Sequence, residues 1–501
     1  MARTEPRTLR RAASAALVAA GALAVVACNG GGPTNQAPSL TAIADQRTTL
    51  GEPVSVSVAV TDEEAATVQV TAASSNEQVV PLSGLAVSGA GASRTLTVTP
   101  GSTTPGTAVV TVTATDAGGR SSTRQFEVVV DHPFAGEPQL LTPQNGDPAG
   151  MAVAMHGDVA VTSGDEYAYA FELVGDEWVE GEKFTSVVNG LSDVQDFGRA
   201  VAVEDGRVLV GAPDTSYTET AQGEVFVFDR SDQGWEFTGA ILDEQSPEDD
   251  DRMGRSVGVS GDHLFAGAPG AAEGGVRSGA VFVYQPDPFG VWQLLGKLTP
   301  SDAVAGTVFG DALDVSGGLL VVGDYANDER AGDGGAAYVF VEDGGFWTEV
   351  EKLVPIDLEA NDQFSIAVAA DDGWVLVSAW NDDDQGDEAG AVYVFSDAGS
   401  GWQLVDKLYA SDAAPFGGFG NSLALDYPYA VVGAYTADAV GTNNGAVYVF
   451  RHDGETWHEV ALLTSPQPGV QSGFGWDVDV SGDYLIVSQV QDPTFTAVYK
   501  R

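Results

Sequence analysis

Residues 149–501 are organised on one internal period. The dipeptide Phe197-Gly198 recurs in altered form, and its second residue falls at positions 198, 254, 310, 365, 420 and 475, in steps of 56, 56, 55, 55 and 55. Two further markers keep this spacing, namely Gly223, Gly279, Gly335, Gly390 and Gly445, and Trp235, Trp292, Trp347, Trp402 and Trp457. Three independent markers with one period exclude chance. They indicate that each repeat is one supersecondary unit packed against its neighbours.

Each repeat has the pattern of four short strands. An alternating run such as 199–203 leads through a tight turn into a second run such as 208–213. A loop of nine to eleven residues precedes a glycine-led run (Gly-Ala-Val-Tyr-Val-Phe at 445–450), and a tryptophan-led run such as 402–408 ends the unit. Four strands in ~55 residues, with glycine and aromatic markers, are typical of a β-propeller blade.

Counting the repeats predicts seven blades. Six copies are complete, the first beginning at the degraded pair Ala149-Gly150, and a seventh begins at Phe474 and stops after three strands. Residues 138–143 match the end of an outer strand at 297–300, so we expect 137–143 to complete the last blade and hide its edge. The expected fold class is all-β: a seven-bladed β-propeller over 137–501, closed by strand 137–143 and preceded by a small antiparallel β-sandwich.

The sandwich is predicted over residues 37–131. Apolar residues alternate with polar ones in several runs, for example at Val54, Val56, Val58 and Val60, and glycine or proline turns separate the runs. About seven short strands in 95 residues indicate a two-sheet sandwich. The segment resembles the cadherin-like and immunoglobulin-like (Ig-like) modules of bacterial surface proteins, notably in Ile-Ala-Asp-Gln at 43–46 and Thr-Val-Thr-Ala-Thr-Asp at 111–116. As a spacer, it would hold the propeller away from a membrane.

The first 36 residues look like an export and anchoring signal. Four arginines precede an apolar run that ends at Val25-Val26-Ala27-Cys28, which resembles the bacterial lipobox, and Cys28 is the single cysteine of the chain. We expect a lipoprotein signal peptide over 1–27, lipidation of Cys28 and a flexible tether over 28–36. Asn29 after the cysteine favours the outer membrane and the cell surface. The alternative is an ordinary secretory signal with an incidental cysteine.

The repeats carry a family resemblance. Phe197-Gly198 followed by Val-Gly-Ala-Pro at 210–213, and Met253-Gly254 followed by Ala-Gly-Ala-Pro at 266–269, resemble FG-GAP repeats, the unit of the integrin alpha-subunit propeller. This resemblance implies recognition of an extracellular ligand. Many FG-GAP blades hold Ca²⁺ in an acidic loop between their first two strands. Here those turns are two or three residues long, as at 261–262 and 317–318, and cannot surround a calcium ion. We therefore expect no metal site in these turns and no cofactor. The alternative is one Ca²⁺ held by the acidic cluster over 381–387.

Composition narrows the function further. With 22 Lys+Arg against 72 Asp+Glu, the formal net charge of −50 argues against a nucleic-acid partner, since phosphate binding requires clustered basic residues. The five histidines are scattered, and the chain has no nucleophile elbow, HExxH motif or phosphate loop. We expect no catalytic residues.

The loops after the second strands contain the candidate binding residues. In three successive repeats the second strand ends at Tyr325, Trp380 and Tyr435, each followed by acids or amides, including Asp328 and Asp383. An arc of aromatic side chains beside carboxylates suits sugar rings or cationic side chains. Alternatively, these rings fill gaps between blades.

These observations predict a cell-envelope lipoprotein whose propeller mediates adhesion or recognition of an extracellular glycan or protein, with the membrane as a second partner through Cys28. One alternative is a scaffold for the assembly of other envelope proteins. The other is a polysaccharide-active enzyme, although the sequence shows no basic or histidine cluster to support it.

Overall fold

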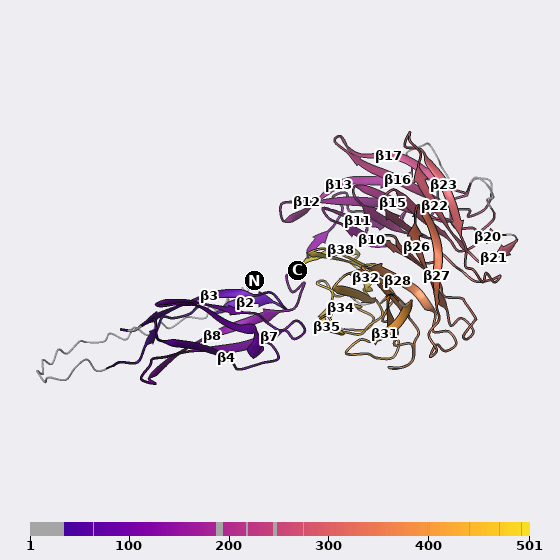
Figure 1. The fold of residues 1–501 in the computed structure, drawn as a ribbon. Coiled ribbons are helices and arrows are strands. Elements are labelled where there is room, and N and C mark those ends of the chain that lie inside the picture. Colours follow the sequence, from indigo (N-terminus) through magenta and orange to yellow (C-terminus); the bar gives the residue numbers. More distant parts are fainter. Residues whose placement is uncertain are drawn as a thin grey trace, which may run out of the picture.

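The structure of the chain is a computed structural model. It describes residues 35–63, 65–186, 194–216, 219–243, 248–273, 275–397, 399, 401–439, 441–469, 471–491 and 493–501. The predicted signal peptide, Cys28 and nearly all of the predicted tether lie outside these residues. In Figure 1 a small sandwich, drawn in indigo and violet, lies beside a larger array of sheets that takes up the rest of the chain.

The sandwich consists of two four-stranded sheets. The first has the order β1 (Ser39–Leu40), β3 (Val54–Thr61), β6 (Ser93–Val98), β5 (Leu85–Ala90). The second has the order β2 (Gln46–Thr49), β8 (Ser121–Asp131), β7 (Gly106–Thr115), β4 (Gln69–Ser74). The short 3-10 helix η1 (Leu82–Gly84) precedes β5. Val56, Val58 and Val60 of β3 are buried, as period-two alternation requires when one face of a sheet covers a core.

One strand pair departs from the expected antiparallel sandwich. β1 pairs with β3 in the first sheet, but β2 pairs with β8 in parallel in the second. The chain leaves the first sheet after Leu40 and enters the second at Gln46, where it runs in the same direction as the last strand. A change of sheet between two short strands leaves no periodic signal, so alternation alone could not predict this pairing.

The array contains seven four-stranded antiparallel sheets within the described residues. Sheet 1 is β10 (Val153–His156), β11 (Val159–Gly164), β12 (Tyr167–Val174), β13 (Glu177–Thr185); sheet 2 is β14 (Val201–Glu204), β15 (Arg207–Ala212), β16 (Glu224–Ser231), β17 (Gly234–Ile241). Sheet 3 is β18 (Ser256–Ser260), β19 (His263–Ala268), β22 (Ala280–Pro286), β23 (Trp292–Leu298); sheet 4 is β24 (Leu313–Ser316), β25 (Leu319–Asp324), β26 (Ala336–Asp343), β27 (Phe346–Leu353).

Sheet 5 is β28 (Phe364–Asp371), β29 (Trp374–Ala379), β30 (Ala391–Asp397), β31 (Trp402–Leu408); sheet 6 is β32 (Leu423–Asp426), β33 (Tyr429–Ala434), β34 (Ala446–His452), β35 (Trp457–Leu463). Sheet 7 is β36 (Phe474–Ser481), β37 (Tyr484–Gln489), β38 (Phe495–Lys500), β9 (Gln139–Leu141). A two-stranded ribbon, β20 (Ala272–Glu273) with β21 (Val276–Arg277), interrupts sheet 3 between β19 and β22.

The first strands of the seven sheets contact one another in chain order, and β10 also contacts β36, the first strand of sheet 7. β9 pairs with β38, opposing Leu141 to Thr496. The Gln139 side chain then bonds the main chain of Trp178 in sheet 1 twice, at 2.6 and 2.8 Å. Sheets 1 and 7 are therefore joined through β9, a strand of sheet 7 that precedes all the other strands of the array in the sequence.

The glycine marker has a direct structural cause. Gly223, Gly279, Gly335 and Gly445 each form a parallel bridge to the aromatic or methionine residue of the next Phe-Gly pair. At Gly279 the backbone φ is +85°, and a Cβ atom would lie 2.0 Å from the carbonyl oxygen of Phe309. Only glycine fits such an approach in that conformation, so the period seen in the sequence is the spacing of the seams between sheets.

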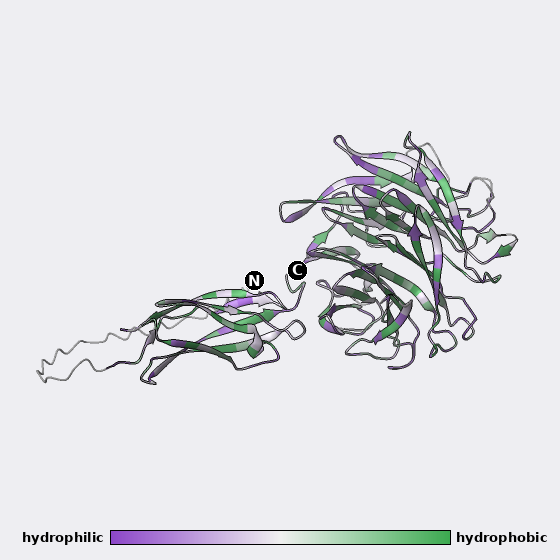
Figure 2. Cartoon of the chain, in the orientation of Figure 1, coloured by the Kyte–Doolittle hydropathy of each residue, from purple (hydrophilic) through white to green (hydrophobic). Residues whose placement is uncertain are grey.

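Apolar residues of adjacent sheets form the cores between them. Figure 2 shows hydrophobic residues along the strands and hydrophilic residues at many of the hairpin turns. The marker tryptophans Trp347 and Trp457 lie in two of these cores, and Trp347 packs edge-on against Phe265 of the preceding sheet at 5.0 Å. The sandwich docks on sheet 6, where Phe134 packs edge-on against Tyr429 at 6.2 Å and Arg451 donates to the carbonyl of Ser102 at 3.1 Å.

Candidate ligand-binding site

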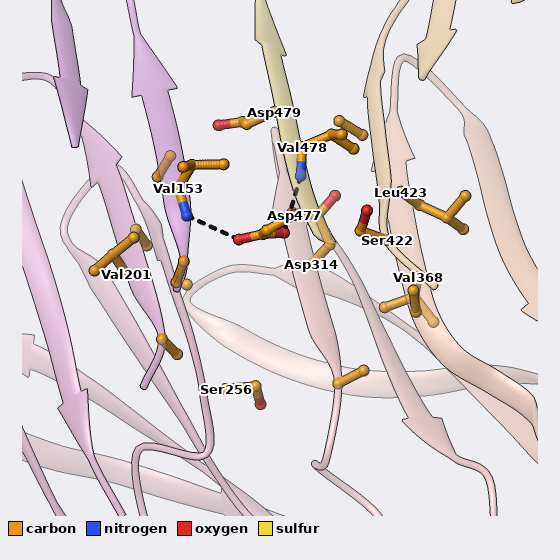
Figure 3. A pocket seen from close by; sticks show the side chains of 18 of the residues that line it. Val153, Val201, Ser256, Asp314, Val368, Ser422, Leu423, Asp477, Val478 and Asp479 are labelled. Carbon is orange, nitrogen blue, oxygen red and sulfur yellow. Dashed lines mark hydrogen bonds between the residues drawn. The ribbon is translucent and has the colours of Figure 1, made fainter. Parts of the chain in front are cut away.

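The first strands of the seven sheets surround a central cavity of about 660 Å³. Figure 3 shows side chains from these strands, among them Val153, Val201, Val368 and Val478, converging on this space. The volume lies within the range of ~300–1,000 Å³ usual for small-molecule sites.

Aspartates on the cavity wall satisfy the free edges of these strands. The N–H groups of Val153 and Met155 donate to Asp477 at 2.8 Å and Asp479 at 2.6 Å, both on the neighbouring strand β36. Ala370 of β28 donates in the same way to Asp314 of β24, at 2.7 Å. A first strand has one edge without a strand partner, and unpaired N–H groups there would be costly. The side chains thus replace the missing strand, as the dashed lines at Asp477 in Figure 3 show.

These aspartates titrate far above the usual range. Burial raises the pKa of Asp314 to about 6, of Asp477 to about 7 and of Asp479 to about 8, although each accepts two main-chain hydrogen bonds that favour the charged form. In Asp479 the neighbouring carboxylates Asp314 and Asp477 raise the pKa further. The cavity wall is therefore less negative at neutral pH than its composition implies.

A similar side-chain latch, meaning a side chain of one sheet that accepts a main-chain N–H of the next, recurs at the far end of the first strands. In three sheets the last residue of the first strand accepts an N–H from a turn of the following sheet: Glu204 from Gly261, Asp371 from Tyr427, and Asp426 from Gly482. Gly157 donates to Ser481 across the junction of sheets 7 and 1, at 3.3 Å.

The opposite mouth of the cavity is formed by the residue that follows each Phe-Gly pair. In order these are Met151, Arg199, Arg255, Asp311, Ile366, Asn421 and Trp476. The Arg255 guanidinium bonds both carboxylate oxygens of Asp311, at 2.8 and 3.3 Å. Within the described residues, no side-chain hydrogen bond or ion pair of Arg199 is present. This mouth is therefore charged over sheets 2 to 4.

Sheets 5 to 7 contribute an aromatic arc to the same mouth, which we define as Trp380, Tyr435 and Trp476. Trp380 stacks on Tyr435 with ring centroids 6.2 Å apart and planes at 28°, and Tyr435 meets Trp476 edge-on at 4.9 Å. Asn421 holds two of these residues in place, because its amide accepts the N–H of Tyr435 at 3.0 Å and donates to the carbonyl of Trp476 at 2.7 Å. All three rings line the cavity.

The structure separates the predicted binding residues. Trp380 and Tyr435 lie together at the mouth, whereas Tyr325 is not among the described residues that line the cavity. Tyr325 is half-buried beside Asp311, and burial raises the pKa of its hydroxyl. Asp328 and Asp383 are exposed, and each accepts the main-chain N–H of the residue five positions on, at 2.8 and 2.6 Å, so that both order their own loops.

The sequence interpretation missed Trp476, Arg199, Arg255 and Asp311. The available signal was their register, since each directly follows the second residue of a Phe-Gly pair. Among the described residues, no group of three or more His, Cys, Asp or Glu side chains is arranged to hold a metal ion. The described part of the chain also contains no helix long and apolar enough to span a membrane.

Fold and site together define an all-β protein that carries a sandwich beside repeated four-stranded sheets around a cavity. The family model for the FG-GAP repeat matches residues 292–340, 347–395 and 402–450, and the model described as "Putative Ig domain" matches residues 37–131. The chain therefore contains three FG-GAP repeats and an N-terminal Ig-like domain, which confirms both resemblances. Each FG-GAP match covers the last strand of one sheet and the first three of the next, so the matched unit includes the seam between sheets.

No curated protein matches the chain. Solved structures that overlap it include the complex of titin M10 with the obscurin-like 1 Ig domain, at 20% identity over 19% of this chain and 95% of that one, TM-score 0.16. The titin M3 domain overlaps at 19% identity over 19% of this chain and 95% of that one, TM-score 0.16. The titin I-band fragment I67–I69 overlaps at 12% identity over 61% of this chain and 94% of that one, TM-score 0.18. At these TM-scores we draw no conclusion from the overlaps.

Proposed function

We propose that this chain is a cell-envelope lipoprotein that recognises an extracellular ligand, a glycan or a protein, at the mouth of its central cavity. The aromatic arc carries this proposal. Three rings on one side of a concave mouth offer apolar faces with polar neighbours, an arrangement suited to adhesion or recognition. The FG-GAP repeats and the Ig-like domain are consistent with a surface protein of this kind.

In this proposal the seven sheets are the blades of a closed seven-bladed propeller. The cyclic contacts of the first strands, the β9–β38 pairing and the latch from Ser481 to Gly157 support closure. A closed ring fixes the positions of residues from different repeats around the mouth, which a linear array of sheets would not do. Rigid placement of this kind favours recognition of a shaped ligand.

The lipid on Cys28 would anchor the molecule, and the tether and sandwich would carry the propeller away from the membrane. The support is the lipobox-like sequence and the Ig-like match over 37–131. Mass spectrometry of the purified protein tests the anchor, because cleavage before Cys28 would remove residues 1–27 and lipidation would add the mass of acyl chains to Cys28.

Binding to immobilised glycans, matrix proteins and whole cells tests the recognition role. We expect retention by the wild-type protein and its loss in a Trp380→Ala/Tyr435→Ala/Trp476→Ala variant that remains folded. Phe289→Ala is the matched control, since Phe289 is an aromatic residue 91% exposed in the β22–β23 turn, outside the cavity. Retention that survives in the triple variant would place the binding site elsewhere.

A second candidate, a scaffold for envelope proteins, is favoured by exposed apolar residues away from the mouth. Phe289 and Ile356 are 91% and 80% exposed on turns of sheet 3 and the loop after sheet 4. Under this alternative, Phe289→Ala would weaken capture of a protein partner while the triple variant would not.

A further inference from the structure

Arg199 differs from the five lysines of this acidic protein. Each of the five lysines is committed to an acceptor, for example Lys183 to Asp147 and Lys407 to Asp382, and Lys297 donates to the carbonyl of Ala272. Lys352 and Lys500 are also ion-paired. Arg199 is half-buried at the cavity mouth, and its guanidinium has no hydrogen-bond or ion-pair partner within the described residues.

The carboxylates near Arg199 are already engaged. Asp311 takes both of its hydrogen bonds from Arg255, and Asp477 accepts the N–H groups of Val153 and Val478. Asp196 is near enough to stabilise the Arg199 charge but forms no ion pair with it. Burial, and then the like charge of Arg255, lower the pKa of Arg199. A guanidinium with unused donors in a partly enclosed site is stabilised when a ligand supplies a carboxylate, because two of its N–H groups can bind the two carboxylate oxygens side by side.

The other half of the mouth supplies flat apolar surface. The aromatic arc lies across the cavity on sheets 5 to 7, whereas Arg199 and Arg255 lie on sheets 2 and 3. A ligand that fills the mouth meets aromatic faces on one side and guanidinium donors on the other. This combination matches a molecule with a hydrocarbon ring face and a carboxylate close to it.

We propose that the mouth binds an acidic sugar, with the carboxylate on the Arg199 guanidinium and the pyranose ring against the aromatic arc. This inference rests on the proposed recognition function and names its ligand class. A uronic acid carries both features on one rigid ring, and the cavity volume of about 660 Å³ accommodates such a unit.

The strand edges argue for a sugar over an acidic peptide. An extended peptide gains affinity by adding a strand to a free sheet edge. Around this cavity, Asp477, Asp479 and Asp314 already occupy edge N–H groups of β10 and β28. A peptide would therefore find few main-chain partners, while a sugar needs none.

Calorimetric titration of the full-length protein with tri-galacturonate, against its neutral methyl ester, tests the assignment at low salt. We expect the acid to bind at least about tenfold more tightly than the ester, and Arg199→Gln to weaken the acid by about 10- to 100-fold without changing the ester. Arg199→Lys keeps the charge but loses the paired N–H donors, so its affinity for the acid should lie between those of the wild type and Arg199→Gln. Arg330→Gln is the control, because it removes an equal charge from an exposed loop position.

Equal binding of acid and ester, or an Arg199→Gln protein that binds the acid as Arg330→Gln does, would overturn the acidic-sugar assignment. Failure to bind tri-galacturonate and sialylated oligosaccharides alike would also overturn it. If matrix proteins or cells were still retained through the aromatic arc in these cases, the proposed recognition function would stand. Loss of all retention would refute both. Unchanged unfolding midpoints in the Arg199 variants exclude misfolding as the cause.

Discussion

At the scale of single residues, the seams between adjacent sheets depend on positive-φ backbone conformations, which are unfavourable for any residue that carries a Cβ atom. The second residue of each Phe-Gly pair has a positive φ. The glycines range from +82° at Gly475 to +135° at Gly150, and in sheet 5 the position is Ser365 at +79°. A serine there is strained. Its hydroxyl compensates by accepting the N–H of Asp324 at 2.9 Å and donating to the carbonyl of Ala336 at 2.7 Å. The repeat thus tolerates a departure from glycine only where new hydrogen bonds bridge the same seam.

The marker glycines should not tolerate even a methyl group. In Gly279→Ala the Cβ atom would meet the carbonyl oxygen of Phe309 at 2.0 Å, which forces two sheets apart. We expect a loss of about 3 kcal/mol or more in unfolding free energy, measured by urea denaturation. The control is Gly261→Ala in the same sheet, where φ is +56° and nothing lies within 4 Å of the Cβ atom, so the cost should be only about 1 kcal/mol. If both variants lost the same unfolding free energy, the backbone conformation, and not the close approach of two sheets, would explain the glycine at position 279.

At the scale of strands, the carboxylates between first strands make the fold sensitive to pH. The pKa of Asp479 is about 8 in the folded protein, against 3.8 for the free side chain, so the folded state holds the proton more tightly. The resulting stabilisation is complete below about pH 4 and is lost as the pH rises toward 8. Asp477 and Asp314 act in the same direction. Asp147 and Asp453 act oppositely, because their pKa values are lowered to about 2 and their contribution is lost only in acid.

We therefore expect the thermal unfolding midpoint to decrease as the pH is raised from 5 to 8. Asp479→Asn should make this decrease smaller, since the amide cannot ionise. The absolute midpoint of the variant can be lower, because an amide has one acceptor oxygen where the carboxyl has two. Asp372→Asn, at an exposed turn, is the control and should leave the slope unchanged. A slope that is the same in wild type and Asp479→Asn would contradict a raised pKa at this position.

How far the sequence predicted the site depended on which features repeat. The glycine, tryptophan and Phe-Gly markers recur in nearly every unit because every seam imposes the same packing. They therefore predicted strands such as β34 and β31. Arg199, Asp311 and Trp476 occupy one register position but differ in each repeat, so no periodicity reveals them. Trp380 and Tyr435 were identified from their place after a strand. The sequence could not show that Tyr325 lies outside the cavity lining, because that depends on how neighbouring loops pack.

At the scale of the whole molecule, one short strand joins the first and last sheets. β9 contains only three residues, yet it pairs with β38 while Gln139 bonds the main chain of sheet 1. Without it, β38 would expose an unpaired edge with alternating apolar residues, which promotes association between molecules. The proposed closed ring therefore depends on a segment that lies outside the repeats.

Replacing 139–141 by Gly-Ser-Gly tests this dependence without changing the length of the chain. We expect a lower thermal midpoint and the appearance of dimers or larger species in analytical ultracentrifugation. The same replacement at 304–306, an exposed part of the loop between sheets 3 and 4, serves as control. A monomeric variant with an unchanged midpoint would contradict closure through β9.

The two-sided attachment of sheet 7 has a consequence for proteolysis. The strands β36, β37 and β38 follow sheet 6 in the chain, yet sheet 7 is also held by β9, by the N–H bonds of sheet 1 to Asp477 and Asp479, and by Lys500 to Asp176. In the proposed closed ring, a protease cut in one exposed loop between sheets leaves two fragments that share a seam at both of their ends. A singly nicked molecule should therefore remain one particle until denaturant is added. Wherever proteases are present, that arrangement would slow the loss of the intact particle more than its exposed loops alone would suggest.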